Sequence, residues 1–249
     1  MGDFFTKDWT GAPFITFGPA HLIGLGIIAL CIAAMIYFGR KASDTGRRNI
    51  RYGLAGLILF IELSWHIWNL ATGQWNIQTM LPLHLCSVMI WLSIFMLLTK
   101  NYTVFEFGYL LGMAGALQAL LTPDAGIYGF PHFRAFQVLI SHGALVAAFI
   151  YMATVENFRP TPKSIVKVLL FSNLYGAVVF GINFLIGSNY LFIAHKPETT
   201  SIIDLMPPWP WYIAIIELLG IIFMLLFYLP YAIKDWSASR STRRVGIRD

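Results

Sequence analysis

Charged residues are scarce in this chain. Only 12% of its 249 residues are Asp, Glu, Lys or Arg, whereas 57% are hydrophobic and the mean hydropathy is +0.67. A soluble domain of ordinary composition carries about 25% charged residues. This shortage excludes a soluble globular protein. The composition predicts an all-α membrane protein whose residues lie mostly in apolar spans of about 20 residues each.

Cysteine is also scarce, and so are the features of a secretory leader. Cys31 and Cys86 are the two cysteines, and both lie inside apolar runs, which argues against a disulfide framework. Residues 1–20 contain no basic stretch followed by a cleavage site, so we do not expect a signal peptide. We also find no internal repeat, which weighs against a transporter built from inverted repeats but does not exclude one.

Seven apolar stretches are long enough to cross a membrane. They cover residues 21–38, 54–72, 81–98, 104–121, 133–154, 165–186 and 211–233. We therefore predict a seven-transmembrane-helix bundle over residues 21–233. An extracytoplasmic segment, residues 1–20, precedes it, and a basic cytoplasmic tail, residues 234–249, follows it.

The distribution of basic residues predicts the orientation of this bundle. Of the 17 Lys and Arg residues, 14 lie in alternate connections and in the tail, and only Lys7, Arg134 and Lys196 lie on the other side. By the positive-inside rule, the N-terminus is outside and the C-terminus is cytoplasmic. The net charge of +5 is then a topology feature and does not indicate a nucleic-acid partner. The predicted location is the plasma membrane, crossed several times.

The stretch LPLHLCS (81–87) is the strongest candidate for chemistry. Pro82 suits the first turn of a helix, and Cys86 then lies about 7–8 Å below the outer end of its span. His84 and Cys86, two residues apart, would point about 200° apart on a regular helix and could not pair. His142 is predicted about 13 Å deep in another span. A histidine that takes the thiol proton produces the nucleophile of acyl transfer, so we predict Cys86 and His142 as the catalytic pair.

Other polar side chains are predicted to share the outer half of the bundle. Glu62, His66 and Asn69 fall at i, i+4 and i+7, on one helix face. Ionisable residues inside membrane helices usually mark function, so we expect this face to line a cavity open to the outer leaflet. The residues expected to support catalysis or bind substrate are His84, His66, Asn69, Glu62, Gln118, Asn183 and Glu217.

Several other interpretations stay open at this point. Each histidine can be structural, and Glu62 can be a protonated residue that bonds to a neighbouring helix. The side chains of Glu62, His66, His84, Cys86 and His142 are all of types that bind zinc, although we expect no metal and no cofactor. A polar outer vestibule would also suit a non-catalytic lipid-binding protein or a transporter.

Four segments resemble a known family. WHIWNLATGQWN (65–76), LPLHLCS (81–87), Gly115 to Pro123 and Ser141-His142-Gly143 look like the YwaF-type integral membrane proteins of Gram-positive bacteria, within a resemblance that covers about residues 15–235. Eukaryotic relatives of that family are transmembrane acyltransferases that remodel phospholipids with a cysteine and a histidine. The resemblance implies that Cys86 corresponds to the catalytic cysteine of these relatives and His142 to their catalytic histidine.

A more distant group, the androgen-induced membrane hydrolases, cleaves fatty-acid esters with threonine and histidine. A cysteine at the corresponding place favours transfer over hydrolysis. The resemblance therefore implies a lipid acyltransferase that acts on a membrane phospholipid or lysophospholipid through a thioester intermediate. The alternatives are a lipid ester hydrolase, with or without zinc, and a non-catalytic lipid-binding protein or transporter.

Overall fold

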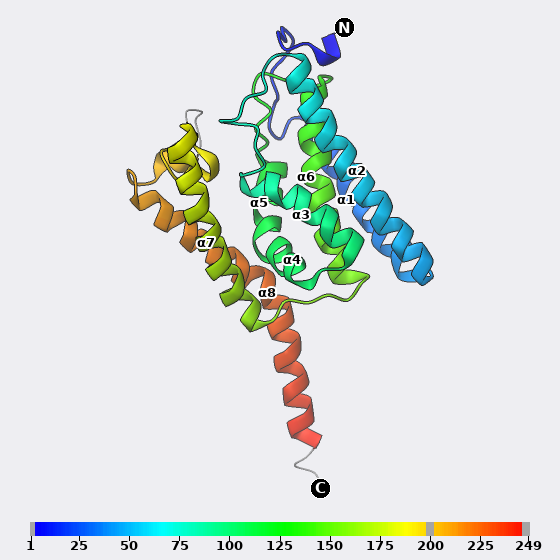
Figure 1. The fold of residues 1–249 in the computed structure, drawn as a ribbon. Coiled ribbons are helices and arrows are strands. Elements are labelled where there is room, and N and C mark those ends of the chain that lie inside the picture. The colour runs from blue at the N-terminus through cyan, green and yellow to red at the C-terminus, as the bar shows by residue number, and fades with distance from the viewer. Residues whose placement is uncertain (1–2, 198–201, 246–249) are drawn as a thin grey trace.

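The computed structural model describes residues 3–197 and 202–245, and over these residues the chain is all-helical, with no β-strand (Figure 1). The α-helices are α1 (Pro19–Lys41), α2 (Asp44–Ala71), α3 (Leu85–Thr99), α4 (Tyr102–Phe107), α5 (Met113–Leu121), α6 (Phe133–Thr154), α7 (Pro162–Ile186) and α8 (Trp211–Val245). A π-helical segment, Gly108–Gly112, joins α4 and α5 into one continuous helix.

Six of the described helices are long and apolar enough to cross a membrane. They are α1, α2, the continuous helix Tyr102–Leu121, α6, α7 and the part of α8 from Trp211 to Ser237. α3 has only 15 residues, which corresponds to about 22 Å at 1.5 Å per residue, less than the roughly 30 Å of a bilayer's hydrocarbon core. The all-helical membrane fold is thus confirmed, while helix length supports six crossings and leaves α3 as a shorter apolar helix.

The predicted start of the third span is wrong, and tertiary contacts explain why. Residues 81–84 form turns, and the helix begins only at Leu85, with His84 in an extended conformation at the N-cap. The Leu81 N–H donates to the Tyr190 hydroxyl at 2.8 Å, and the Tyr175 hydroxyl donates to the Leu83 carbonyl at 2.9 Å. These bonds from α7 and the chain after it hold the segment out of the helix. Pro82 therefore lies outside the helix, and the predicted helical separation of His84 and Cys86 does not apply.

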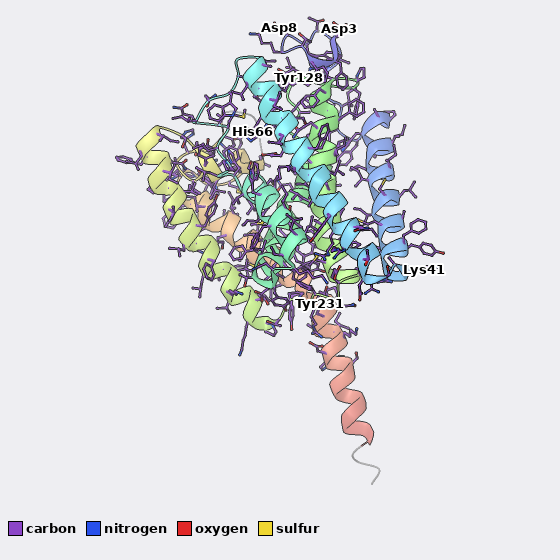
Figure 2. The ribbon with its side chains drawn as sticks, turned by 45° about the vertical axis from the view of Figure 1, so that its right-hand side comes forward. Asp3, Asp8, Lys41, His66, Tyr128 and Tyr231 are labelled. Atoms are coloured by element: carbon purple, nitrogen blue, oxygen red, sulfur yellow. The ribbon has the colours of Figure 1, made fainter. Side chains whose placement is uncertain are left out.

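α6 is the central helix of the bundle. It packs against α1, α2, α3 and α5, and most of its residues are buried. α1 and α2 lie on one side of this core, while α7 and α8 pair on the other side (Figure 1). The two ends of the chain lie at opposite ends of the molecule (Figure 1). Figure 2 likewise shows Asp3, Asp8 and Tyr128 at one end, and Lys41 and Tyr231 at the opposite end.

The end that carries the N-terminus is closed by an N-terminal strap, which we define as residues 3–18. Three consecutive carbonyls of the strap, those of Phe5, Thr6 and Lys7, accept hydrogen bonds from Trp68 Nε1, His132 Nε2 and the Tyr128 hydroxyl, respectively. At its other end, the Phe17 N–H donates to His21 Nδ1 at 2.9 Å. The strap is therefore tied to α1, to α2 and to the segment before α6.

The opposite end carries ion pairs whose carboxylates are buried. Glu156, just after α6, contacts Arg51 of α2 at 3.0 Å and also contacts Lys100, which follows α3. Glu106 of α4 pairs with Lys167 of α7 at 2.6 Å. Basic residues from three predicted cytoplasmic connections thus meet acidic partners at one end of the bundle.

Candidate functional site

Cys86 is the second residue of α3, at a helix N-terminus that no side chain caps. The first hydrogen bond of this helix runs from the Val88 N–H to the His84 carbonyl at 2.9 Å. Within the described part of the chain, the N–H groups of Leu85, Cys86 and Ser87 have no acceptor, and the His84 side chain does not cap them. Cys86 therefore lies in the first turn of α3, at the positive end of the helix dipole.

This position has two chemical consequences. A helix N-terminus stabilises a thiolate, because its dipole and its unpaired N–H groups favour negative charge. The same N–H groups are suited to hold the oxyanion that forms when a thiolate attacks an ester carbonyl. The thiol is half-buried against α5, where a Cβ added to Gly115 would lie 3.4 Å from Cys86 Sγ.

His142 lies on α6 in a defined tautomeric state. Its Nδ1 lies 2.7 Å from the Val138 carbonyl oxygen, one turn earlier on the same helix. A carbonyl can only accept, so Nδ1 carries the proton, and the neutral ring has its lone pair on Nε2. No described residue forms a hydrogen bond to Nε2. The ring is therefore oriented and left with a basic nitrogen, the form that a general base requires.

The described contacts do not join the two predicted catalytic residues. Within residues 3–197 and 202–245, the Cys86 thiol makes no hydrogen bond, to His142 or to any other residue. Catalytic hydrogen bonds are often long in the absence of substrate and tighten only when the substrate is bound. The pairing of Cys86 with His142 therefore stays a prediction.

Glu62 and His66 of α2 do meet. His66 Nε2 lies 3.3 Å from Glu62 Oε1, and the Trp75 Nε1–H donates to His66 Nδ1 at 3.1 Å (Figure 2 labels His66). Because Nδ1 accepts this bond, the ring proton is on Nε2 and faces the carboxylate. The three side chains form a chain of contacts, Trp75–His66–Glu62, at the end of the bundle that carries the strap.

Arg134 of α6 packs beside Trp65, the neighbour of His66 in α2, and was not among the site residues predicted from the sequence. Its guanidinium lies 4.1 Å from the centroid of the Trp65 ring and donates to Gln137 Oε1 and, at 2.9 Å, to the Asp124 carbonyl. Its contact with the Trp65 ring joins α6 to α2. In the sequence, Arg134 is one of three basic residues on the predicted outer side, and that position alone indicates no role in a site.

Three of the predicted supporting residues form hydrogen bonds within or between helices, away from Cys86 and His142. Asn69 donates to the Trp65 carbonyl of its own helix, and Asn183 Oδ1 accepts from the Ser188 hydroxyl and the Tyr190 N–H just after α7. Glu217 accepts a hydrogen bond from Asn173 at 2.8 Å.

His84 lies between the Tyr190 and Phe192 rings, and its Nδ1 accepts from the Leu191 N–H at 3.3 Å. Gln118 is exposed. The predicted supporting residues thus do not form one continuous polar lining.

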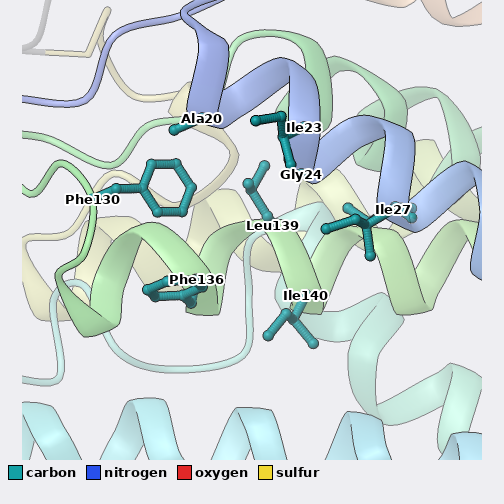
Figure 3. Close-up of a pocket in the computed structure, with 9 residues that line it drawn as sticks. Ala20, Ile23, Gly24, Ile27, Phe130, Phe136, Leu139 and Ile140 are labelled. Atoms are coloured by element: carbon teal, nitrogen blue, oxygen red, sulfur yellow. The ribbon is translucent and has the colours of Figure 1, made fainter.

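A cavity of about 410 Å³ lies between α1 and α6, and every residue that lines it is apolar (Figure 3). None of the predicted site residues is part of this lining, and the expected cavity along the Glu62 face stays a prediction. Among the described residues, no group of three or more His, Cys, Asp and Glu side chains is arranged to hold a metal ion.

The comparison with protein families identifies the chain. The model of the TMEM164 family matches residues 16–228. The chain belongs to the TMEM164 family. Together with the six long apolar helices, this membership makes it a multi-pass membrane protein. The comparisons with curated proteins and with solved structures gave no match.

Proposed function

We propose that this TMEM164-family protein is a membrane lipid acyltransferase in which Cys86 is the nucleophile and His142 is the general base. The observation that carries the proposal is the place of Cys86 at an uncapped helix N-terminus, where free N–H groups suit both a thiolate and an oxyanion. The free Nε2 of His142 and the resemblance to YwaF-type proteins support it.

The proposed reaction has two balanced halves. His142 Nε2 takes the thiol proton, and the Cys86 sulfur attacks the ester carbonyl carbon of a phospholipid. The ester C–O bond breaks, the acyl group stays on sulfur as a thioester, and the lysolipid oxygen leaves with the proton held by His142. A second lysolipid hydroxyl then gives its proton to His142 and attacks the thioester carbonyl. The C–S bond breaks, and the proton passes from His142 to sulfur, which restores the Cys86 thiol and the neutral His142.

The proposed topology places this site toward the outer leaflet. We take α3 as a seventh crossing, with the N-terminus outside and the C-terminus in the cytoplasm of a plasma-membrane protein. The distribution of Lys and Arg, and the opposite positions of the two termini (Figure 1), support this topology.

The test is an acyl-exchange assay on purified protein in vesicles, with labelled phospholipid as donor and unlabelled lysophospholipid as acceptor. We expect transfer that is lost in Cys86→Ala and in His142→Ala. Cys31→Ala is the matched control, because Cys31 is exposed on α1, and it should transfer normally. Release of free fatty acid that survives Cys86→Ala would favour a hydrolase instead. Lipid binding without turnover would favour a non-catalytic lipid-binding protein or transporter.

A further inference from the structure

The cavity between α1 and α6 is built by helical spacing. On α1, Ala20, Ile23, Gly24 and Ile27 fall at i, i+3, i+4 and i+7, which places them on one face of the helix. On α6, the stretch from Phe136 to Ile140 forms the facing wall (Figure 3). We call this space the α1–α6 groove.

Small residues determine where the two helices approach. A Cβ at Gly24 would lie 3.0 Å from Leu139 Cδ1, so glycine allows the walls to come close there. Deeper in the membrane, a Cβ at Gly143 would lie 3.0 to 3.1 Å from the Ile28 side chain, and this contact closes the groove. At the shallow end, Phe130 lines the groove and packs against Phe14 of the N-terminal strap, with 5.6 Å between ring centroids.

The groove opens onto the surface that faces lipid. α1 is a candidate membrane span with few buried residues, and Ile23 and Ile27 on the groove face are 63% and 56% exposed. The groove is therefore continuous with the hydrocarbon contact surface of a multi-pass membrane protein. A headgroup has no polar partner in the groove, whereas a hydrocarbon chain fits its lining.

The length of the groove fits one leaflet. From Ala20 to Ile28 the helix rises about 12 Å at 1.5 Å per residue, close to half of the roughly 30 Å hydrocarbon core of a bilayer. The volume of about 410 Å³ lies within the range of about 300–1,000 Å³ typical of small-molecule sites. We propose that the α1–α6 groove binds one acyl chain of a phospholipid from the leaflet on the strap side. The identity of this lipid as the acyl donor rests on the proposed function.

The experiment uses the full-length protein in phosphatidylcholine vesicles that contain a phosphatidylcholine with a photoactivatable acyl chain. Irradiation followed by peptide mass spectrometry should place the label on groove residues of α1 and α6, such as Ile27 and Ile140. Ile23→Trp should lower this labelling about tenfold, the effect of excluding about two methylene groups. Leu22→Trp is the matched control, because Leu22 is 52% exposed on α1 outside the groove, and its labelling should match that of the wild type.

The outcomes separate the two proposals. Labelling spread evenly along α1, or labelling unchanged in Ile23→Trp, would overturn the acyl-chain site. Cross-links at the groove between two copies of the protein, in place of lipid adducts, would also overturn it. Labelling does not need turnover, so Cys86→Ala should keep the wild-type pattern. If the groove is labelled and no acyl exchange occurs, the site stands and the proposed function fails. If the protein is active and Ile23→Trp changes neither acyl exchange nor labelling, the proposed function stands and the acyl-chain site fails.

Discussion

Glu156 shows how much a single buried carboxylate can contribute at the residue scale. It meets Arg51 at 3.0 Å and also contacts Lys100, and the Arg51 and Glu156 side chains are only 7% and 4% exposed. Arg51 Nε and Glu156 Oε1 form no aligned hydrogen bond, so their contact is mainly attraction between charges. Removing one partner of such a pair leaves the other charge buried and uncompensated.

We therefore expect Glu156→Gln to destabilise the protein by about 3 kcal/mol, measured as a lower thermal unfolding temperature in detergent. Asp235→Asn is the control, because Asp235 and Arg159 form an exposed pair, 51% and 43% accessible, at 2.5 Å. Its expected cost is below about 1 kcal/mol, as for other exposed pairs. Equal losses in the two variants would contradict the buried pair's role.

His132 can form both of its hydrogen bonds only in its neutral form, because a protonated Nδ1 can no longer accept from the Arg134 N–H. Its Nδ1 accepts from the Arg134 N–H at 3.1 Å while its Nε2 lies 2.8 Å from the Thr6 carbonyl. Burial lowers the pKa of His132 below its ordinary 6.5, and the bond to Thr6 offsets part of this shift. The unfolded chain thus binds a proton near pH 6.5 that the folded chain does not bind. Stability from this group is present above that pH and falls as the pH drops below it.

We expect the unfolding temperature of the wild type to fall between pH 7.5 and pH 5.5. His132→Asn keeps an N-cap acceptor but does not titrate, so its unfolding temperature should fall less over the same range. Groups that both proteins share cancel in the difference between the two slopes. Identical slopes would show that His132 does not contribute.

At the scale of elements, the π-helical segment depends on a close approach between helices. A Cβ at Gly108 would lie 2.1 Å from Cε1 of Phe149, which is fully buried on α6. We expect Gly108→Ala to destabilise the protein by about 1–3 kcal/mol through overpacking. Denaturant or thermal unfolding measures this, and Phe149→Leu in the same chain should restore part of the loss.

Gly176 of α7 provides the control for this prediction. A Cβ there meets nothing within 4 Å, so Gly176→Ala should be neutral or stabilise the helix by up to about 1 kcal/mol. If both alanines had the same effect, packing against Phe149 would not explain the glycine.

Local spacing predicted some elements well, and contacts between distant segments explain the misses. The i, i+4 spacing predicted that Glu62 and His66 share one helix face, and their contact on that face follows from the geometry of a single helix. The start of α3 was not predictable in this way, since Tyr175 and Tyr190 lie about a hundred residues later in the chain. The contact between Arg134 of α6 and Trp65 of α2 is another one that the periodicity of the sequence does not reveal.

For the whole molecule, hydropathy predicted the all-helical membrane fold and its long helices, because apolar length is a property of each segment. It did not predict that one apolar stretch would form only the 15-residue α3. The side of the membrane on which each end lies is still a prediction from the Lys and Arg distribution.

This topology can be measured by cysteine labelling in intact cells, in a Cys31→Ala and Cys86→Ala background. We expect a membrane-impermeant maleimide to label Asp3→Cys but to label Ser237→Cys only after the cells are opened. The reverse pattern would invert the orientation, and labelling of both in intact cells would mean an even number of crossings.

The account's central claim is that Cys86 carries the acyl group. Purified protein incubated with excess phospholipid and no acceptor should gain the mass of one acyl chain on the peptide that contains Cys86, and hydroxylamine should remove it. The adduct should also form in Cys31→Ala. Full acyl exchange by Cys86→Ala, or exchange by the wild type with no adduct on Cys86, would contradict the claim.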